Sequence, residues 1–174
     1  MGEILGEISV GVYPYLPREV PKKCWEDFNV GDKIETFGIT ITDAHLVLWA
    51  GLTGDFFPLH MCEEYAKRTI FKGRIVHGPL TFALAVGLVG MTGIFEDSII
   101  AWLGVRDMRL PAPVRVGDTI RVIAEVVEKK ETSRPDRGIV VIRYTVKNQR
   151  DETVLIADNV FLMHRRAGFK QHQQ

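Results

Sequence analysis

The sequence predicts an α+β domain in which a curved antiparallel sheet wraps around one central, buried helix. A stretch without charged residues, 78–95, begins with Gly-Pro and is typical of a helix enclosed by its own protein. Four segments rich in β-branched residues follow it, at 99–110, 119–129, 138–147 and 153–165. Helices that precede a run of strands argue against a parallel sheet built from alternating strands and helices.

The elements before the central helix are shorter. Residues 33–41 alternate between apolar and polar in the manner of a strand. Thr42 or Asp43 can cap a following helix, which should stop near Gly54. Residues 63–69 indicate a further short helix. The first helix should bury one apolar face, made of Ala44, Val47, Leu48 and Gly51.

The length of 174 residues and the 46% hydrophobic fraction favour one globular domain with a single core. The expected organisation is an irregular N-terminal arm at 1–24, which contains three prolines, a single domain at 25–166 and a polar C-terminal tail at 167–174.

The charge balance points to small molecules or proteins as partners. Twenty-two basic and twenty-two acidic residues cancel, so no overall field attracts nucleic acid or an anionic membrane. Pro79 and three glycines interrupt the apolar stretch 78–95, which favours a buried helix over a membrane span. Two cysteines without metal or disulfide spacing, and an N-terminus unlike a signal peptide, lead us to expect a cytoplasmic protein.

The segment Gly-Asp-Phe-Phe-Pro-Leu-His, 54–60, is the most informative for chemistry. On a continuous helix, Asp55 and His60 would point in different directions. Pro58 removes a backbone donor and favours an extended Phe57, so we expect a tight connection that aims both side chains at one point. A carboxylate and an imidazole that share a water can activate it. By spacing alone, a loop-stabilising aspartate and a surface histidine are the commoner interpretation.

A second segment, Ile-Val-His-Gly-Pro at 75–79, strengthens the catalytic interpretation. Exposed amides at a helix N-terminus form a partial positive pole, and Gly78 permits close approach of a ligand to the backbone. Such an amide suits the developing oxyanion of a polarised thioester. We expect His77 to position this helix start and to stand outside the catalytic set.

These two segments together resemble the MaoC-like, (R)-specific enoyl-CoA hydratase family. The resemblance implies a hot-dog fold, a homodimer, and reversible hydration of trans-2-enoyl-CoA to (R)-3-hydroxyacyl-CoA, with coenzyme A as part of the substrate and no other cofactor. It implies that Asp55 and His60 are the catalytic pair, that the Gly78 N–H is the oxyanion donor, and that Pro79 lies beside it in the substrate site. The family pattern has asparagine where this chain has Phe57, which changes the local hydrogen bonding.

Two other functions remain open from the sequence. A hot-dog thioesterase would use a carboxylate-activated water at the thioester carbon. A non-catalytic acyl-thioester-binding subunit is favoured by Phe57 in place of the family asparagine. We expect no metal site, because His60 with Glu63 and Glu64 lacks a second histidine at ligand spacing.

Overall fold

The computed structural model describes residues 23–95 and 97–170, and a six-stranded antiparallel sheet dominates it. The sheet runs in the order β1-β4-β5-β6-β3, and β2 also pairs with β4. The strands are β1 (Lys33–Glu35), β2 (Ile39–Thr40), β3 (Ile99–Arg109), β4 (Thr119–Glu131), β5 (Arg137–Lys147) and β6 (Thr153–His164). The four long strands predicted from the sequence are therefore confirmed, with ends that differ by no more than two residues.

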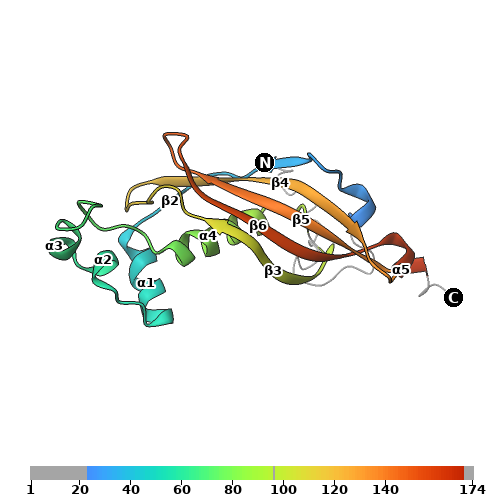
Figure 1. Ribbon diagram of the computed structural model, residues 1–174, viewed down its shortest axis with the longest axis horizontal. Helices are drawn as coiled ribbons and strands as arrows, with labels where there is room; N and C mark the ends of the chain where they lie inside the picture. The colour runs from blue at the N-terminus through green and yellow to red at the C-terminus, as the bar shows by residue number, and fades with distance from the viewer. Residues whose placement is uncertain (1–22, 96, 171–174) are drawn as a thin grey trace, which may run out of the picture.

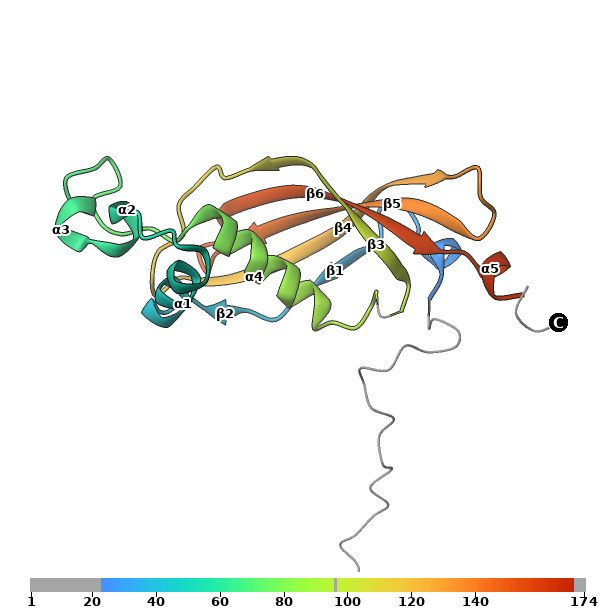
Figure 2. The ribbon, with the colours of Figure 1, turned by 90° about the horizontal axis from the view of Figure 1, so that it is seen from below.

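The longest helix lies along one face of the sheet, and three shorter helices gather at one end of the molecule (Figures 1 and 2). The helical elements are η1 (Trp25–Asp27), α1 (Asp43–Thr53), α2 (Pro58–Met61), α3 (Glu63–Ala66), α4 (Gly78–Gly90) and α5 (Arg166–Lys170). None of the described helices has the length and apolar character required to cross a membrane.

The core lies between α4 and the long strands. Alternate residues of β4 are buried, because successive side chains of a strand point to opposite faces of the sheet. From the helix side, Leu80, Ala85, Leu88 and Val89 join the same buried cluster. This arrangement confirms the α+β class and the curved antiparallel sheet packed on a central helix that the sequence predicts.

In a single copy of the chain, the central helix α4 is buried along one side only. Ala83, Val86, Gly87 and Gly90 of α4 are exposed. The sheet is one layer and covers only one side of the helix, so an apolar helix placed on it keeps its opposite side in solvent. The buried positions of α4 therefore form a stripe and do not surround the helix.

The prediction of which face of α1 is buried is wrong. Leu46 and Ala50 are buried, whereas the four residues expected to face the core are exposed. Because α1 is apolar on nearly all sides, hydrophobic periodicity could not select the face that packs. The predicted end of the helix is confirmed: Gly54 caps it in the left-handed conformation with φ 77°.

The strand predicted at 33–41 is split into β1 and β2. Between them, the hydroxyl oxygen of buried Thr36 accepts a hydrogen bond from the Val122 N–H at 3.0 Å and donates one to the Phe37 carbonyl at 2.8 Å. A side chain thus occupies a position in the ladder that a backbone carbonyl would otherwise take.

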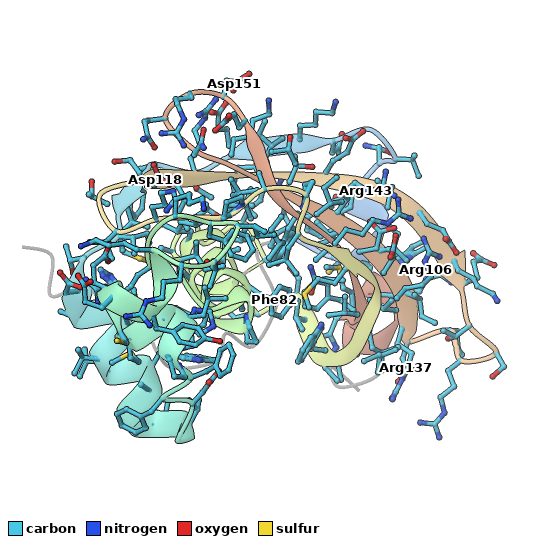
Figure 3. All side chains as sticks on the ribbon, turned by 60° about the vertical axis from the view of Figure 1, so that its left-hand side comes forward. Phe82, Arg106, Asp118, Arg137, Arg143 and Asp151 are labelled. Atoms are coloured by element: carbon cyan, nitrogen blue, oxygen red, sulfur yellow. The ribbon has the colours of Figure 1, made fainter. Side chains whose placement is uncertain are left out.

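An ion cluster spans the three strands β5, β6 and β3. Arg143 contacts the nearly buried Asp158 through two nitrogens, at 2.7 and 2.9 Å, and Arg106 approaches the same carboxylate at 3.5 Å. Figure 3 shows the two arginines on the same side of the sheet. The paired geometry compensates the cost of placing a carboxylate at a buried sheet position.

Most of the predicted arm and tail, residues 1–22 and 171–174, lies outside the described residues, so the irregular arm and the polar tail stay predictions. Helix α5 begins at Arg166, one residue before the predicted tail.

The contact between Gly138 and Trp25 yields a test of the packing. A Cβ atom at Gly138 would lie 2.5 Å from the indole nitrogen of Trp25. That ring cannot move freely, because its N–H donates to the Ile139 carbonyl and the cationic groups of Lys129 and Arg165 lie 4.0 and 4.7 Å from its centroid. We expect Gly138→Ala to lower the free energy of unfolding by roughly 1–3 kcal/mol in denaturant titrations.

Gly51→Ala is the matched control, because a Cβ atom there would meet nothing within 4 Å and the residue lies inside α1. It should stabilise the protein by about 0.5–1 kcal/mol. Equal stabilities for the two variants would contradict the packing at Gly138.

Candidate active site

A tight turn between α1 and α2 carries Asp55. Gly54 reverses the chain in its left-handed conformation, and the Phe57 N–H donates a hydrogen bond to the Asp55 carboxylate at 3.3 Å. Phe57 is extended, with φ −55° and ψ 131°, as expected for a residue before proline. The predicted tight connection is therefore present at 54–57. The sequence did not predict that Pro58 begins the short helix α2, on which His60 lies.

His60 is held by a backbone carbonyl from the segment before α4. Its Nδ1 lies 2.8 Å from the carbonyl oxygen of Ile75. A carbonyl only accepts hydrogen bonds, so Nδ1 carries the proton, and the neutral ring keeps an unprotonated Nε2. This tautomer leaves His60 with one nitrogen able to accept a proton from water.

His77, directly before α4, is fully buried and contacts both predicted catalytic residues. Its Nε2–H donates to the backbone carbonyl of Asp55 at 3.1 Å. Its ring lies against the ring of His60, with centroids 3.9 Å apart and planes 30° apart. Burial lowers the pKa of His77 below the usual range of histidine, although its hydrogen bond to the Asp55 carbonyl acts in the opposite direction.

The three side chains converge. A carboxylate oxygen of Asp55, a ring nitrogen of His60 and a ring nitrogen of His77 all lie within 4.8 Å of one another. The tight turn thus brings Asp55 and His60 together, as the sequence argument requires.

The same cluster raises the question of a metal ion. The two rings face each other with centroids 3.9 Å apart and a tilt of 30°, so their in-plane lone pairs do not meet at one point at metal–ligand distance. This geometry suits a water held by Asp55 and His60 better than a metal ion.

An apolar pocket of about 230 Å³ adjoins the cluster, and both His60 and Gly78 line it. The Leu110 side chain lies so close to Gly78 that a Cβ atom on the glycine would be 2.9 Å from it. Gly78 is the first residue of α4, so its N–H has no partner within the helix. Asp55 and Pro79 are outside the pocket lining, and Pro79 is exposed.

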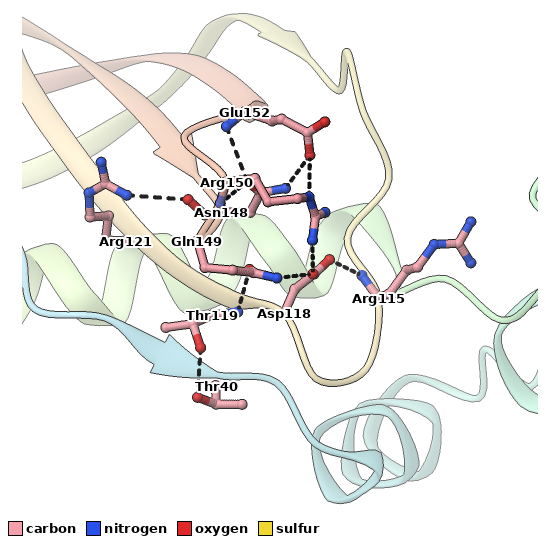
Figure 4. Close-up of polar contacts among 9 residues, drawn as sticks. All are labelled: Thr40, Arg115, Asp118, Thr119, Arg121, Asn148, Gln149, Arg150 and Glu152. Carbon is pink, nitrogen blue, oxygen red and sulfur yellow. Dashed lines mark hydrogen bonds and ion pairs between the residues drawn. The ribbon is translucent and has the colours of Figure 1, made fainter.

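A polar network fixes one wall of this pocket. The Asp118 carboxylate accepts hydrogen bonds from the Arg115 backbone N–H at 2.8 Å, from Gln149 at 2.7 Å and from Arg150 at 3.1 Å (Figure 4). The guanidinium of Arg115 in turn donates to the carbonyl of Phe71, which lines the pocket. The segment between β3 and β4 is thereby held against the segment that precedes α4.

His77 is the site residue that sequence reasoning left aside. Seventeen positions separate it from His60 in the chain, and no spacing rule joins the two. The available signal was the histidine directly before a Gly-Pro helix start, a position that the backbone of a nearby turn can approach.

Comparison with known proteins places this geometry in a family. The family described as "MaoC like domain" matches residues 27–148. Protein MaoC from Klebsiella aerogenes is 38% identical over 117 residues, which are 67% of this chain and 34% of that protein. The chain therefore spans about a third of that relative. An (R)-specific enoyl-CoA hydratase from Rhodospirillum rubrum is 33% identical over 107 residues, covering 59% of this chain and 68% of that enzyme.

Solved structures support the same assignment. An X-ray structure of a monoamine oxidase regulatory protein from Archaeoglobus fulgius superposes with a TM-score of 0.79 at 40% identity, over 82% of this chain and 95% of that one. A Mycobacterium tuberculosis protein with a double hot-dog fold superposes with a TM-score of 0.71 over 82% of this chain and 44% of that one; at 20% identity it shows the fold alone. The chain therefore has the hot-dog fold and belongs to the MaoC-like domain family.

Proposed function

We propose that this protein catalyses the reversible hydration of a trans-2-enoyl-CoA to an (R)-3-hydroxyacyl-CoA. The observation that carries the proposal is the approach of the Asp55 carboxylate and a His60 ring nitrogen to within 4.8 Å, beside the N-terminus of α4. The name of the Rhodospirillum rubrum relative, an (R)-specific enoyl-CoA hydratase, supports this reaction and its stereochemistry.

In the proposed reaction one water lies between Asp55 and His60. Both groups can accept a hydrogen bond from it, since the carboxylate has no proton and the neutral His60 ring keeps Nε2 free. As the water oxygen bonds to C3, its proton passes to one member of the pair, and C2 receives a proton from the same pair. The roles of the two groups are exchangeable, and the sum is addition of one water across the double bond.

The thioester oxygen gains negative charge when C3 is attacked. We assign its stabilisation to the Gly78 N–H, which opens α4 and lines the pocket next to His60. Pro79 is the second residue of the helix, where a missing N–H removes no hydrogen bond within the helix. The apolar walls suit an acyl chain, and coenzyme A enters as part of the substrate with no separate cofactor.

We also propose a cytoplasmic location. Cys24 and Cys62 are free thiols, the state that a reducing compartment maintains.

A substrate panel tests the reaction. Loss of the enoyl-thioester absorbance should accompany hydration of crotonyl-CoA or of a longer or branched enoyl-CoA. Asp55→Asn and His60→Gln should each reduce turnover on the order of a hundredfold or more, because each removes a group that exchanges a proton with water. The exposed Val30→Ala is the control and should keep normal rates.

The same panel separates the other functions. Release of free thiol would show a thioesterase. Acyl-CoA binding in calorimetry without turnover of any substrate would show a binding subunit, the function that the half-exposed Phe57 ring favours. Normal hydration rates in both Asp55→Asn and His60→Gln would contradict the proposed mechanism.

We further propose that the active protein is a homodimer joined along β3. This strand forms an edge of the sheet among the described residues. It exposes large apolar side chains, including Trp102 at 53% and Leu103 at 54%. An unpaired apolar edge is unfavourable in water, and pairing with a second copy removes it. The exposed side of α4, at Val86, is apolar as well.

Sedimentation should report a particle with about twice the mass of one chain. Trp102→Arg should shift the particle toward the monomer, because it places a charge at the proposed interface. Val30→Arg changes an apolar residue that is also more than half exposed, beside the opposite sheet edge, and should leave the mass unchanged. A wild-type monomer at micromolar concentration would contradict the dimer.

A further inference from the structure

We propose that His77 is a positioning residue that couples Asp55 to His60 and holds both at the N-terminus of α4. The inference rests on the proposed function for its catalytic consequence, but its structural content can be measured without turnover. Three contacts carry it, and each joins His77 to a different part of the site.

The first contact fixes the backbone of Asp55. The His77 Nε2–H donates to the Asp55 carbonyl at 3.1 Å, across 22 positions of sequence. The carboxylate of Asp55 is separately oriented by the Phe57 N–H at 3.3 Å. Asp55 is therefore restrained at its main chain by the residue before α4 and at its side chain by its own turn. Both restraints are needed to aim a carboxylate that lies on a loop.

The second contact fixes the ring of His60. The His77 ring lies on its face at a centroid distance of 3.9 Å, and the Ile75 carbonyl holds its edge through Nδ1 at 2.8 Å. Residues 75 and 77 thus constrain both the tilt and the in-plane rotation of the imidazole. A ring with both motions restricted presents Nε2 in one direction.

The third contact joins His77 to the helix. Its carbonyl accepts hydrogen bonds from the N–H of Thr81 at 3.1 Å and from the hydroxyl of Thr81 at 3.3 Å. Gly78, the proposed oxyanion donor, is the next residue in the chain. His77 therefore links the proposed oxyanion donor to both members of the water-holding pair.

The unpaired Nδ1 of His77 indicates that the Nε2–H donor is the part of the imidazole that the site requires. This atom is buried and has no hydrogen-bond partner among the described residues. An unsatisfied buried polar atom costs about 1–3 kcal/mol, whereas a phenyl ring would stack on His60 without that cost. The imidazole differs from a phenyl ring by the Nε2–H that reaches Asp55. The ionisable groups that interact with His77 are Asp55 and His60. A neutral His77 ring places no positive charge against the face of His60.

Two substitutions separate the donor from the ring. His77→Phe keeps an aromatic ring against His60 and removes the donor, whereas His77→Gln places an amide donor near the position of Nε2 and removes the ring. We expect His77→Phe to lower kcat roughly tenfold to a hundredfold with KM within about twofold, because misplaced groups lose turnover more than binding. His77→Gln should recover part of that loss, because it restores a donor to the Asp55 carbonyl but leaves the His60 ring without its neighbour.

Asn159→Leu is the matched control. Asn159 is also fully buried, also carries an unpaired polar atom and lies in β6. Its substitution should leave kcat and KM near the wild-type values. Equal losses in His77→Phe and Asn159→Leu would assign the effect to general destabilisation and overturn the proposal.

Nuclear magnetic resonance supplies the readout that does not depend on turnover. In the wild-type protein at neutral pH, His77 should be the neutral tautomer protonated at Nε2. The carbonyl carbon of Asp55 should shift in His77→Phe and keep its wild-type shift in His77→Gln. A His77 protonated at Nδ1, or an Asp55 carbonyl unaffected by His77→Phe, would overturn the proposal even if no enoyl-CoA is turned over.

If His77→Phe does not fold, the position of the proton on His77 in the wild-type protein, Nε2 or Nδ1, tests the proposal by itself. Inactive wild-type protein with the expected spectra would instead refute the proposed function alone.

Discussion

The candidate site depends on the packing of α4 against the sheet. Leu80, Ala85, Leu88 and Val89 are buried in the core, and this apolar contact sets the direction in which the helix N-terminus points. The amide pole of the helix can stabilise a developing charge only if it is held rigidly, since stabilisation of a transition state requires dipoles that do not reorient during the reaction. A sheet-packed helix provides that rigidity.

The proposed catalytic side chains, Asp55 and His60, lie outside this core, on a turn and a one-turn helix that contribute little burial. Their positions come from directed polar contacts with the segment that leads into α4, at Ile75 and His77. A second set of contacts, around Asp118, holds the opposite wall of the pocket. Apolar packing therefore positions helix α4, and hydrogen bonds of defined direction position the reactive groups relative to it.

Phe57 shows how one departure from the family pattern is accommodated. Its backbone N–H still contacts the Asp55 carboxylate, so the turn retains a donor at this position without an asparagine side chain. The aromatic ring lies near the rings of His60 and Tyr65, at centroid distances of 6.1 and 6.2 Å, and stays half exposed. The substitution therefore leaves this backbone contact to the carboxylate in place and changes the chemical character of the surface beside it.

Features that depend on local chemistry were determined by the sequence. The long strands follow from β-branched alternation, the end of α1 from a glycine that tolerates positive φ, and the start of α4 from Gly-Pro. The motif also indicated that the chain around Pro58 brings Asp55 and His60 together, although it did not indicate that His60 lies on the short helix α2. Only the tertiary structure decided which side of α1 is buried, because an apolar helix has no preferred face until a partner surface is present. The approach of His77 to both residues was likewise decided by tertiary structure, because the packing of α4 brings together segments that no sequence period connects.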